Sequence, residues 1–383
     1  MLIDFWASHE MQRQAGRSVL EALSRSHDCA WLGEGDVPRP GARAAVVLGH
    51  VSDFPAVRKS RDGYRYLFFL SHDLGETGNG SIYRDFYMRQ FDIVFAPGEL
   101  YAKAAKRDLP SGVRVDICGW PKYDVATLPP EAAALVSRLE AARARGPVVI
   151  YAASRPQNAG WREILPVLLD SGATVVVKNH VHFGAAELEA FRAAGTKPIE
   201  LSESEAMEAM AGARPDAIVA PRELNLCALF PFADVLVSDN SSCLIEFLPF
   251  GPSIETDPAG EMSAGFPEIV HAPAARLAEL AGSAAAIKAL LAAKPRGKGS
   301  ATIFRPDGEG AGKLAARLIE GFMSEAGPDE VLAAARRRLG RGPVFGAPIG
   351  ERFAYSLFMA GRVARNPGLL ARRLFKGSAR ARS

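Results

Sequence analysis

The sequence has few cysteines and no long hydrophobic run. Its 383 residues include four cysteines, which are scattered along the chain without the spacing of a metal site or a disulfide framework. No stretch approaches the roughly 18 consecutive apolar residues that a membrane-spanning helix needs. The first residues, MLIDFWASHE, contain acids and no basic leader, so we expect no signal peptide. Together these features predict a cytoplasmic protein whose cysteines are reduced.

Acidic residues are absent from the last part of the chain, residues 352–383. Of the 46 basic residues, eight lie between Arg352 and Ser383, and the remaining 38 are accompanied by all 43 acidic residues. Apolar and aromatic residues interleave with these cations. We expect a basic helical extension over residues 327–383, and two interpretations stay open. The segment either contacts anionic lipid at the inner face of the cytoplasmic membrane or packs on the first domain. No nucleic-acid-binding motif accompanies the charge, so nucleic acid is not an expected partner.

Short hydrophobic runs alternate with helical patterns along the rest of the chain. The runs are nearly continuous and rich in Val, Ile and Phe, which is typical of strands in a parallel sheet that is covered on both faces. The pattern restarts after an amphipathic segment at residues 129–147. A chain of 383 residues also exceeds the usual size of one core. We therefore predict an α/β protein with two doubly wound domains, residues 1–125 and 126–326.

The elements of this prediction follow from the same patterns. The expected strands include LIDFWAS, CAWLGE, AAVVLGHV, YLFFLSH, DIVFAPGE, VRVDICGW, PVVIYAAS, ATVVVKNH, a run near KPIELSES, DVLVSDN and PSIETD. The expected helices include EMQRQAGRSVLEALSRS, WREILPVLLDSG, ELNLCALFPFA, SSCLIEFLPFG and GAGKLAARLIEGF, and the last of these is expected to close the second domain.

Polar residues follow several of these strands, at the edge where parallel sheets bind their ligands. His72 and Asp73 lie at the end of the strand YLFFLSH. Histidine titrates near neutrality, so His72 is suited to take a proton from a hydroxyl group, and a structural role bonded to backbone is the alternative. The glycines of the next loop lack the GxGxxG spacing and the lysine of a phosphate-binding loop.

Two serines occupy the break between the strand DVLVS and the helix after it. Backbone N–H groups and hydroxyls at a helix start can bind an anion, which makes Ser241 and Ser242 a candidate phosphate site. Plain capping of the helix by Asp239 or a serine is the alternative. Lys178 and His180 follow the strand ATVVV and share one face of extended backbone. They are candidates for a cationic phosphate clamp, or else ordinary strand-end polarity.

Three further residues lie at predicted strand ends. Arg155 follows PVVIYAAS, where a guanidinium can hold a phosphate with two hydrogen bonds. Lys122 and Asp124 lie in GWPKYD, beside the expected cleft between the domains. His180 and His182 are close in sequence, but no third ligand has suitable spacing, so we expect no metal.

These strand ends, in this order, resemble the CDP-glycerol glycerophosphotransferase family, the polymerases and primases of teichoic-acid-like polymers. SHDLG is similar to the His-Gly motif of that family, GWPKYD to its Gly-x-Pro-Arg-Asn-Asp turn, YAASRP to its Thr-Trp-Arg strand end and KNHVH to its Lys-x-His-Pro. DVLVSDNSSCLIEFLPFGPSIE resembles most closely the family's Asp-Tyr-Ser-Ser segment. The likeness spans about residues 65–260.

The resemblance implies a GT-B architecture, with two facing Rossmann-like domains and the nucleotide held mainly by the second. It implies that His72 is the base, that His180 acts at the catalytic centre by binding and neutralising the donor diphosphate, and that Glu246 lies near the ribose or the cytidine of the donor. The remaining implied donor-binding residues are Arg155, Lys178, Asp239, Ser241 and Ser242, and the implied residues at the acceptor side or between the domains are Asp73, Lys122 and Asp124.

The activity that the resemblance implies is transfer of glycerol phosphate from CDP-glycerol to a hydroxyl of a glycan or lipid-linked acceptor. The reaction releases CMP and requires neither metal nor cofactor. The chain departs from the family where Asp73 and Leu74 follow His72 and where no proline follows His180. These departures leave room for a related polyol phosphate. Two alternatives stay open: a glycosyltransferase that uses a nucleotide sugar, and a non-catalytic nucleotide-binding or scaffold protein.

Overall fold

The structure is a computed structural model. The residues it describes are 1–33, 35–49, 64–74, 82–84, 88, 90–125, 128–154, 156, 160–180, 193, 195, 199–266, 268–273, 304 and 310–325. The predicted extension over residues 327–383 therefore lies outside the described residues. None of the helices in the described ranges is both long enough and apolar enough to cross a bilayer.

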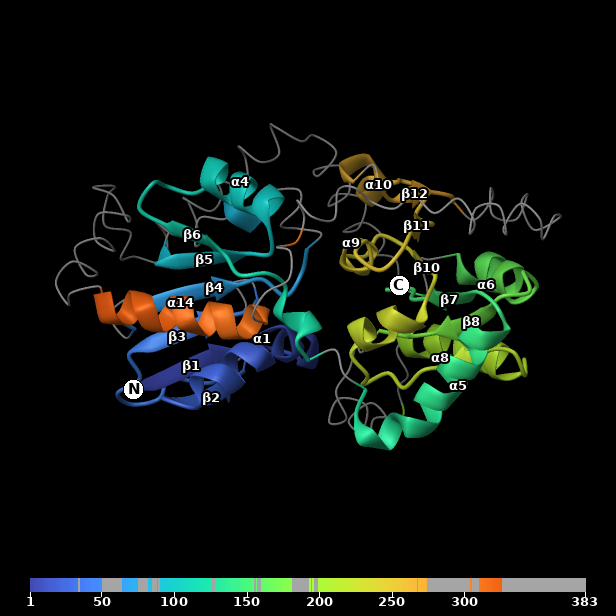
Figure 1. The fold of residues 1–383 in the computed structure, drawn as a ribbon, viewed down its shortest axis with the longest axis horizontal. Coiled ribbons are helices and arrows are strands. Elements are labelled where there is room, and N and C mark those ends of the chain that lie inside the picture. The colour runs from blue at the N-terminus through green and yellow to red at the C-terminus, as the bar shows by residue number, and fades with distance from the viewer. Residues whose placement is uncertain are drawn as a thin grey trace.

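The described strands form two six-stranded sheets in which neighbouring strands are parallel (Figure 1). The first has the order β2-β1-β3-β4-β5-β6 and the second the order β12-β11-β10-β7-β8-β9. The strands of the first are β1 (Leu2–Trp6), β2 (Asp28–Leu32), β3 (Ala44–Val47), β4 (Tyr66–Leu70), β5 (Ile93–Ala96) and β6 (Arg114–Ile117). Those of the second are β7 (Val148–Tyr151), β8 (Thr174–Val177), β9 (Ile218–Val219), β10 (Val235–Ser238), β11 (Ser253–Glu255) and β12 (Val270–His271). The predicted α/β class with parallel sheets is confirmed.

Helices lie over the faces of both sheets. Those that accompany the first sheet are α1 (Glu10–Leu23), η2 (Ile82–Arg84), α4 (Glu99–Asp108) and α14 (Ala311–Glu325). Those that accompany the second are α5 (Ala133–Arg145), α6 (Trp161–Leu169), α8 (Ile199–Gly212), η7 (Leu226–Phe232), α9 (Cys243–Glu246) and α10 (Glu261–Gly265). We call these two assemblies the first unit and the second unit. The short helices η4 (Pro121–Tyr123) and η5 (Pro130–Ala132) connect them, and the predicted division near residue 125 falls in this connection.

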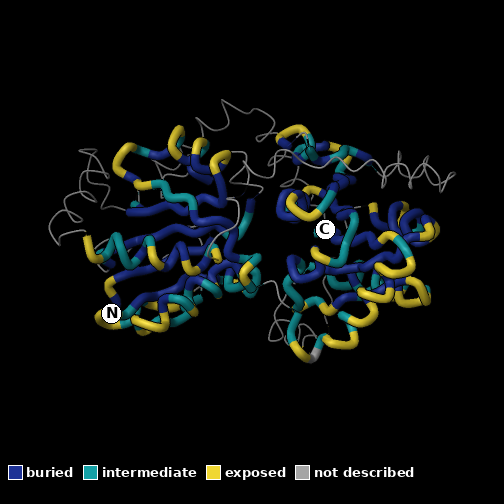
Figure 2. The backbone as a smooth tube through the Cα atoms, viewed as in Figure 1, coloured by how far each residue is buried: buried dark blue, intermediate teal, exposed yellow. Residues whose placement is uncertain are grey.

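The strands form because both of their faces are buried. All residues of β3, β4, β5, β7, β8 and β10 are buried, as the dark blue strands in Figure 2 show. Successive residues point to opposite faces: Ile3 and Phe5 belong to the apolar cluster on one face of the first sheet, and Trp6 to the cluster on the other. Nearly continuous apolar runs are the expected composition of such strands.

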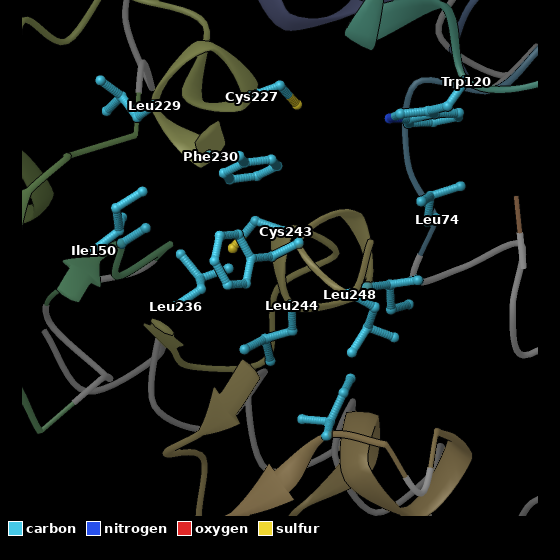
Figure 3. Packing of buried hydrophobic residues seen from close by; sticks show 14 of the residues in the cluster. Leu74, Trp120, Ile150, Cys227, Leu229, Phe230, Leu236, Cys243, Leu244 and Leu248 are labelled. Carbon is cyan, nitrogen blue, oxygen red and sulfur yellow. The ribbon is translucent and has the colours of Figure 1, made fainter. Parts of the chain in front are cut away.

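One apolar cluster continues from the first unit into the second. Leu74 and Trp120 come from the first unit, and they belong to the same buried cluster as Cys227, Phe230 and Leu244 of the second. Figure 3 shows Leu74 and Trp120 on one side of this cluster and Cys227 and Phe230 across from them. Because this contact is apolar and buried, it fixes the two units against each other more firmly than a wet, polar interface would.

Helix α14 returns to the first unit. It packs along α1, and Leu314, Ala315 and Ile319 belong to the core of the first sheet (Figure 1, orange). A side chain at Gly312 would meet the Ser18 hydroxyl at 2.2 Å, so the close approach of the helices requires glycine there. The prediction that this helix closes the second unit is therefore wrong. Its apolar face was evident from the sequence, but which sheet it covers depends on the path of the chain.

Three local predictions also differ from the structure. The expected strand near KPIELSES is the start of α8, where Ile199–Gly212 continues into strong helix formers and buries Met207 and Ala211, four residues apart. The expected helix ELNLCALFPFA is the 3-10 helix η7, which contains Pro231. The expected helix over SSCLIEFLPFG is one turn long, because α9 ends at Glu246 and the chain turns back toward β11.

A buried carboxylate anchors the first strand. Asp4 is 0% exposed and accepts hydrogen bonds from Arg39 Nε at 2.6 Å and from the Tyr64 hydroxyl at 2.6 Å. The same guanidinium also binds Asp28 at 2.9 Å, but the Asp28 side chain is 66% exposed. Two carboxylates thus share one arginine in very different surroundings.

We expect Asp4→Ala to lower the free energy of unfolding by about 3–5 kcal/mol, because it removes the buried carboxylate that accepts from both Arg39 and Tyr64. Asp28→Ala removes an exposed partner of the same arginine and serves as the matched control, with an expected loss of about 0–1 kcal/mol. Urea unfolding followed by circular dichroism measures both. Equal losses in the two variants would contradict the stabilising role of the buried pair.

Candidate active site

A cavity lies at the carboxyl edge of the second sheet. Its walls include the residues that follow three strands: Ala152 to Ser154 after β7, Lys178 to His180 after β8, and Ser241 to Cys243 after β10. β7 and β10 are neighbours whose chain connections leave in opposite directions, since β8 lies on one side of the pair and β11 on the other. Such a reversal of strand order opens a crevice between the loops, and ligands of parallel sheets bind there.

The first unit closes the other side of the cavity. Met11 and Gln14 of α1 line it, as does Lys122 of η4. The Gln14 amide also donates to the Glu223 carbonyl at 3.4 Å, and the Asn225 amide donates to the Lys122 carbonyl at 3.2 Å. The space between the walls is about 620 Å³, including open solvent at the mouth. Residues of both units therefore wall the cavity.

The two serines of the sequence prediction line this cavity. The Ser242 hydroxyl makes no capping hydrogen bond to α9, and the Ser241 hydroxyl accepts only a long one, 3.4 Å, from the Cys243 amide. Both hydroxyls can donate to a ligand oxygen. The helix itself is one turn long, so its dipole adds little, and the hydroxyl donors carry most of the anion-binding capacity of this turn.

Asp239 holds the loops around the cavity and is not one of the residues that line it. Its side chain is buried and accepts a hydrogen bond from the Ser154 amide at 2.9 Å. The Ser238 hydroxyl donates to the Ala152 carbonyl. Both contacts join the end of β10 to the end of β7 and set the width of the crevice. The structure therefore gives Asp239 a positioning contact.

Lys178 and His180 line the cavity together, as their shared strand face predicts. Lys178 is 5% exposed and its ammonium donates to the Asn179 carbonyl at 2.7 Å and to the Arg222 carbonyl at 2.8 Å. Burial lowers the pKa of Lys178 to about 8, although Glu223 and Glu208 attract the proton. A third N–H donor of this ammonium is left for a ligand.

A partly buried polar network supports this strand end. Arg222 binds both carboxylate oxygens of Glu208 at 2.7 Å, and the Asn179 amide donates to Glu208 at 2.7 Å. Hydrogen bonds from Arg222 and Asn179 overcome the effect of burial and lower the pKa of Glu208. The network fixes the backbone from which Lys178 and His180 project.

Glu246 and Lys122 both line the cavity and form an ion pair across the two units. Their nitrogen and oxygen are 2.9 Å apart, and the side chains are 4% and 11% exposed. The second carboxylate oxygen lies 3.4 Å from the Cys227 thiol. Burial lowers the pKa of Lys122, but the charge and hydrogen bond of Glu246, together with nearby Cys227 and Asp73, outweigh it and the net shift is upward. Lys122 is therefore a fixed positive charge in the cavity.

The other predicted residues lie elsewhere. His72 and Asp73 follow β4 at the carboxyl edge of the first sheet and do not line the cavity among the described residues. The charge of Asp73 still acts on Lys122. Asp124 caps α14 by accepting hydrogen bonds from the Ala311 and Gly312 amides, so its carboxylate stabilises the start of that helix. Arg155 lies outside the described residues.

The His72 ring lies next to the first-unit wall of the cavity. Its Nδ1 is 2.7 Å from the Leu48 carbonyl oxygen, and its ring contacts the ring of His9 edge to face at 5.4 Å. His9 immediately precedes α1, the helix that carries Met11 and Gln14 into the cavity wall. His72 thus lies beside the start of α1.

The sequence prediction missed several lining residues. Asn179 lies between the predicted site residues Lys178 and His180, and its position at the end of a strand could have indicated that it lines the cavity. Met11 and Gln14 carried no such signal, because they reach the cavity only through the packing of the two units, and Asn225 lies before η7 rather than at a strand end. Among the described residues, no group of three or more His, Cys, Asp or Glu side chains is arranged to hold a metal ion.

Two facing Rossmann-like units with a cavity between them define the GT-B fold, which confirms the architecture that the resemblance implied. Three solved structures share it at 10–11% identity: the MnaA–UDP co-structure from S. aureus, a UDP-GlcNAc 2-epimerase from Neisseria meningitidis bound to UDP-GlcNAc, and a UDP-N-acetylglucosamine 2-epimerase from Rickettsia bellii. Their TM-scores are 0.56, 0.51 and 0.53, over 84%, 85% and 88% of this chain and 97%, 100% and 98% of theirs.

Comparisons with protein-family models and with curated proteins find no match. At 10–11% identity the structural likeness establishes the fold of this chain and no more.

We expect neutral His72 to carry its proton on Nδ1, because the Leu48 carbonyl at 2.7 Å can only accept a hydrogen bond. Nε2 is then the basic nitrogen. Long-range ¹H–¹⁵N NMR, recorded at a pH at which the imidazoles are neutral, distinguishes the two tautomers. Because the chain has seven histidines, the signal that disappears in His72→Gln is assigned to His72. A protonated Nε2 would show that the Leu48 contact does not hold the ring.

Proposed function

We propose that this protein is an enzyme that binds a nucleoside-diphosphate-linked donor in the cavity and transfers the linked group to a hydroxyl of an acceptor. The observation that carries the proposal is the composition of the crevice where the strand order of the second sheet reverses. Two serine hydroxyls, Lys178 and His180 converge there, and Lys122 completes the wall from the first unit. Hydroxyl and ammonium donors around one cavity are suited to the oxygens of a diphosphate.

The similar structures support the same class of donor. The S. aureus structure contains UDP and the N. meningitidis structure contains UDP-GlcNAc. We therefore propose a nucleotide sugar as the first candidate donor, with transfer of its glycosyl group. The bond from the anomeric carbon to the diphosphate oxygen breaks, the acceptor oxygen bonds to that carbon, and a nucleoside diphosphate is released.

CDP-glycerol or a related CDP-polyol is the second candidate donor. The segment with Ser241 and Ser242 resembles the glycerophosphotransferases most closely, and both hydroxyls line the cavity. In this reaction the acceptor oxygen attacks phosphorus, the diphosphate bridge breaks and CMP is released. The two candidates thus differ in the bond that breaks and in the nucleotide that is released.

His72 is the proposed base in either reaction. An acceptor hydroxyl that enters from the first unit passes the start of α1, where the rings of His9 and His72 lie. Removal of its proton makes the oxygen a better nucleophile at the moment of attack. We propose that the acceptor is a glycan or a lipid-linked glycan and that the enzyme works at the inner face of the cytoplasmic membrane. The basic segment after residue 351 is consistent with that setting.

Product analysis tests the proposal. The protein is incubated with an envelope extract as acceptor and with UDP-GlcNAc, CDP-glycerol or CDP-ribitol as donor. Release of UDP supports glycosyl transfer, and release of CMP supports polyol phosphate transfer. If none of the donors is consumed and neither UDP nor CDP binds in calorimetry, the proposed function is wrong.

We expect His72→Ala to reduce turnover by about 10²–10⁴-fold, the usual contribution of a general base. The affinity for UDP or CDP should change by less than about threefold, because His72 does not line the cavity. His27→Ala, which changes a histidine that follows the C-terminal end of α1 and contacts Glu320 of α14, is the control. Unchanged turnover in His72→Ala would exclude His72 as the base.

We also expect the affinity for UDP or CDP to fall as the pH rises through about 8. Burial lowers the pKa of Lys178 to about 8, so its ammonium loses its charge there, and an uncharged amine no longer attracts the diphosphate. Affinity should fall by up to about tenfold per pH unit above 8. Calorimetry from pH 7 to 9.5 measures it. Lys178→Arg keeps its charge and should flatten the profile, and a parent profile that is already flat would exclude the role of Lys178.

A further inference from the structure

Lys122 brings a positive charge from the connection between the units into a cavity whose other walls belong mainly to the second unit. We propose that Lys122 is a phosphate-binding residue, whose ammonium bridges between Glu246 and the diphosphate of the bound donor. This inference rests on the proposed function, because it concerns the same cavity and the same class of ligand. It assigns to Lys122 a contact with the donor rather than a purely structural ion pair.

The ammonium has donor capacity to spare. A lysine ammonium has three N–H donors, and within the described residues Lys122 Nζ makes one hydrogen bond, to Glu246 at 2.9 Å. The face of the Trp120 ring lies 5.4 Å from the same nitrogen and adds a favourable but non-directional contact. The side chain is 11% exposed and lines the cavity. The remaining donors therefore lie at the cavity wall with little access to bulk water.

The position of the ammonium is fixed before a ligand arrives. The Tyr123 hydroxyl donates to the Glu246 carbonyl, and the Asn225 amide donates to the Lys122 carbonyl at 3.2 Å. Both contacts join η4 to the second unit on either side of the Lys122 side chain. A charge that is already placed and desolvated costs little reorganisation when an anion binds.

The charge balance of the cavity favours an anionic group at this point. Among the described residues that line it, Lys122 and Lys178 are the lysines and Glu246 is the one carboxylate. Glu246 also lies one helical turn after Ser242, whose carbonyl accepts the Glu246 amide, so the ammonium held by Glu246 lies on the side of the cavity where the serine hydroxyls are. A diphosphate is the ligand class whose oxygens can accept from the hydroxyls and from both lysines.

This contact has a consequence for the two units. Lys122 lies in the connection after the first sheet, whereas the serines, Lys178 and His180 belong to the second unit. A diphosphate that binds all of them strengthens the contact between the units. By linkage, the docking of the units strengthens the binding of the diphosphate by the same factor.

The experiment compares two variants, Glu246→Gln and the double variant Lys122→Met/Glu246→Gln. The single change Lys122→Met would leave Glu246 buried without its cation, which is strongly destabilising, and the double change avoids this by removing both charges. Glu246→Gln keeps an amide oxygen that can accept a hydrogen bond from the ammonium. The probes are UDP, CDP, uridine and cytidine, each titrated by calorimetry into the folded protein. Lys106→Met, which removes an exposed lysine from α4, is the control for the loss of one positive charge.

We expect the double variant to bind UDP or CDP about 10- to 100-fold more weakly than Glu246→Gln, because a hydrogen bond to a charged group is lost. Its affinity for uridine or cytidine should stay within about twofold. Equal affinity of the two variants for UDP or CDP, or an equal loss for the nucleosides, would overturn the inference and leave Lys122 as the structural partner of Glu246. If the unaltered protein binds none of the four probes, the proposed function fails and the inference fails with it.

Discussion

The reversal of strand order in each parallel sheet is the constraint on which the rest of the structure depends. In the second sheet the connections leave β7 and β10 in opposite directions, so their following loops diverge and a crevice opens between them. The first sheet has the same reversal between β1 and β3, where α1 begins. The buried cluster shared by the units holds these two edges face to face, and the cavity is the space that this arrangement leaves.

The sequence was sufficient to predict the sheets and part of the cavity. Strands buried on both faces require nearly continuous apolar runs, and YLFFL and VVIY are runs of this kind that can be read directly from the sequence. The parallel arrangement then brings strand ends to one edge. Lys178, His180, Ser241 and Ser242 could be grouped on that argument alone, and they do line one cavity.

What the sequence did not reveal depends on contacts between distant segments. Asp124 and Asp239 are acids at strand ends, just like a ligand-binding acid, but one caps α14 and the other holds the Ser154 amide. The neighbouring sequence does not distinguish a structural acid from a ligand-binding acid, because the amide that each carboxylate binds lies 85 or 188 residues away in the chain. The pairing of Lys122 with Glu246 has the same origin, and so does the return of α14 to the first unit.

The central claim is that a nucleoside diphosphate binds at the strand-order reversal of the second sheet. Hydrogen–deuterium exchange with and without saturating UDP or CDP tests it most directly, because it reports where the ligand protects backbone amides. The account predicts slower exchange in peptides that cover residues 152–154, 178–180 and 241–243, and unchanged exchange in α4 on the first sheet. Binding accompanied by protection elsewhere, with these three loops unaffected, would contradict it.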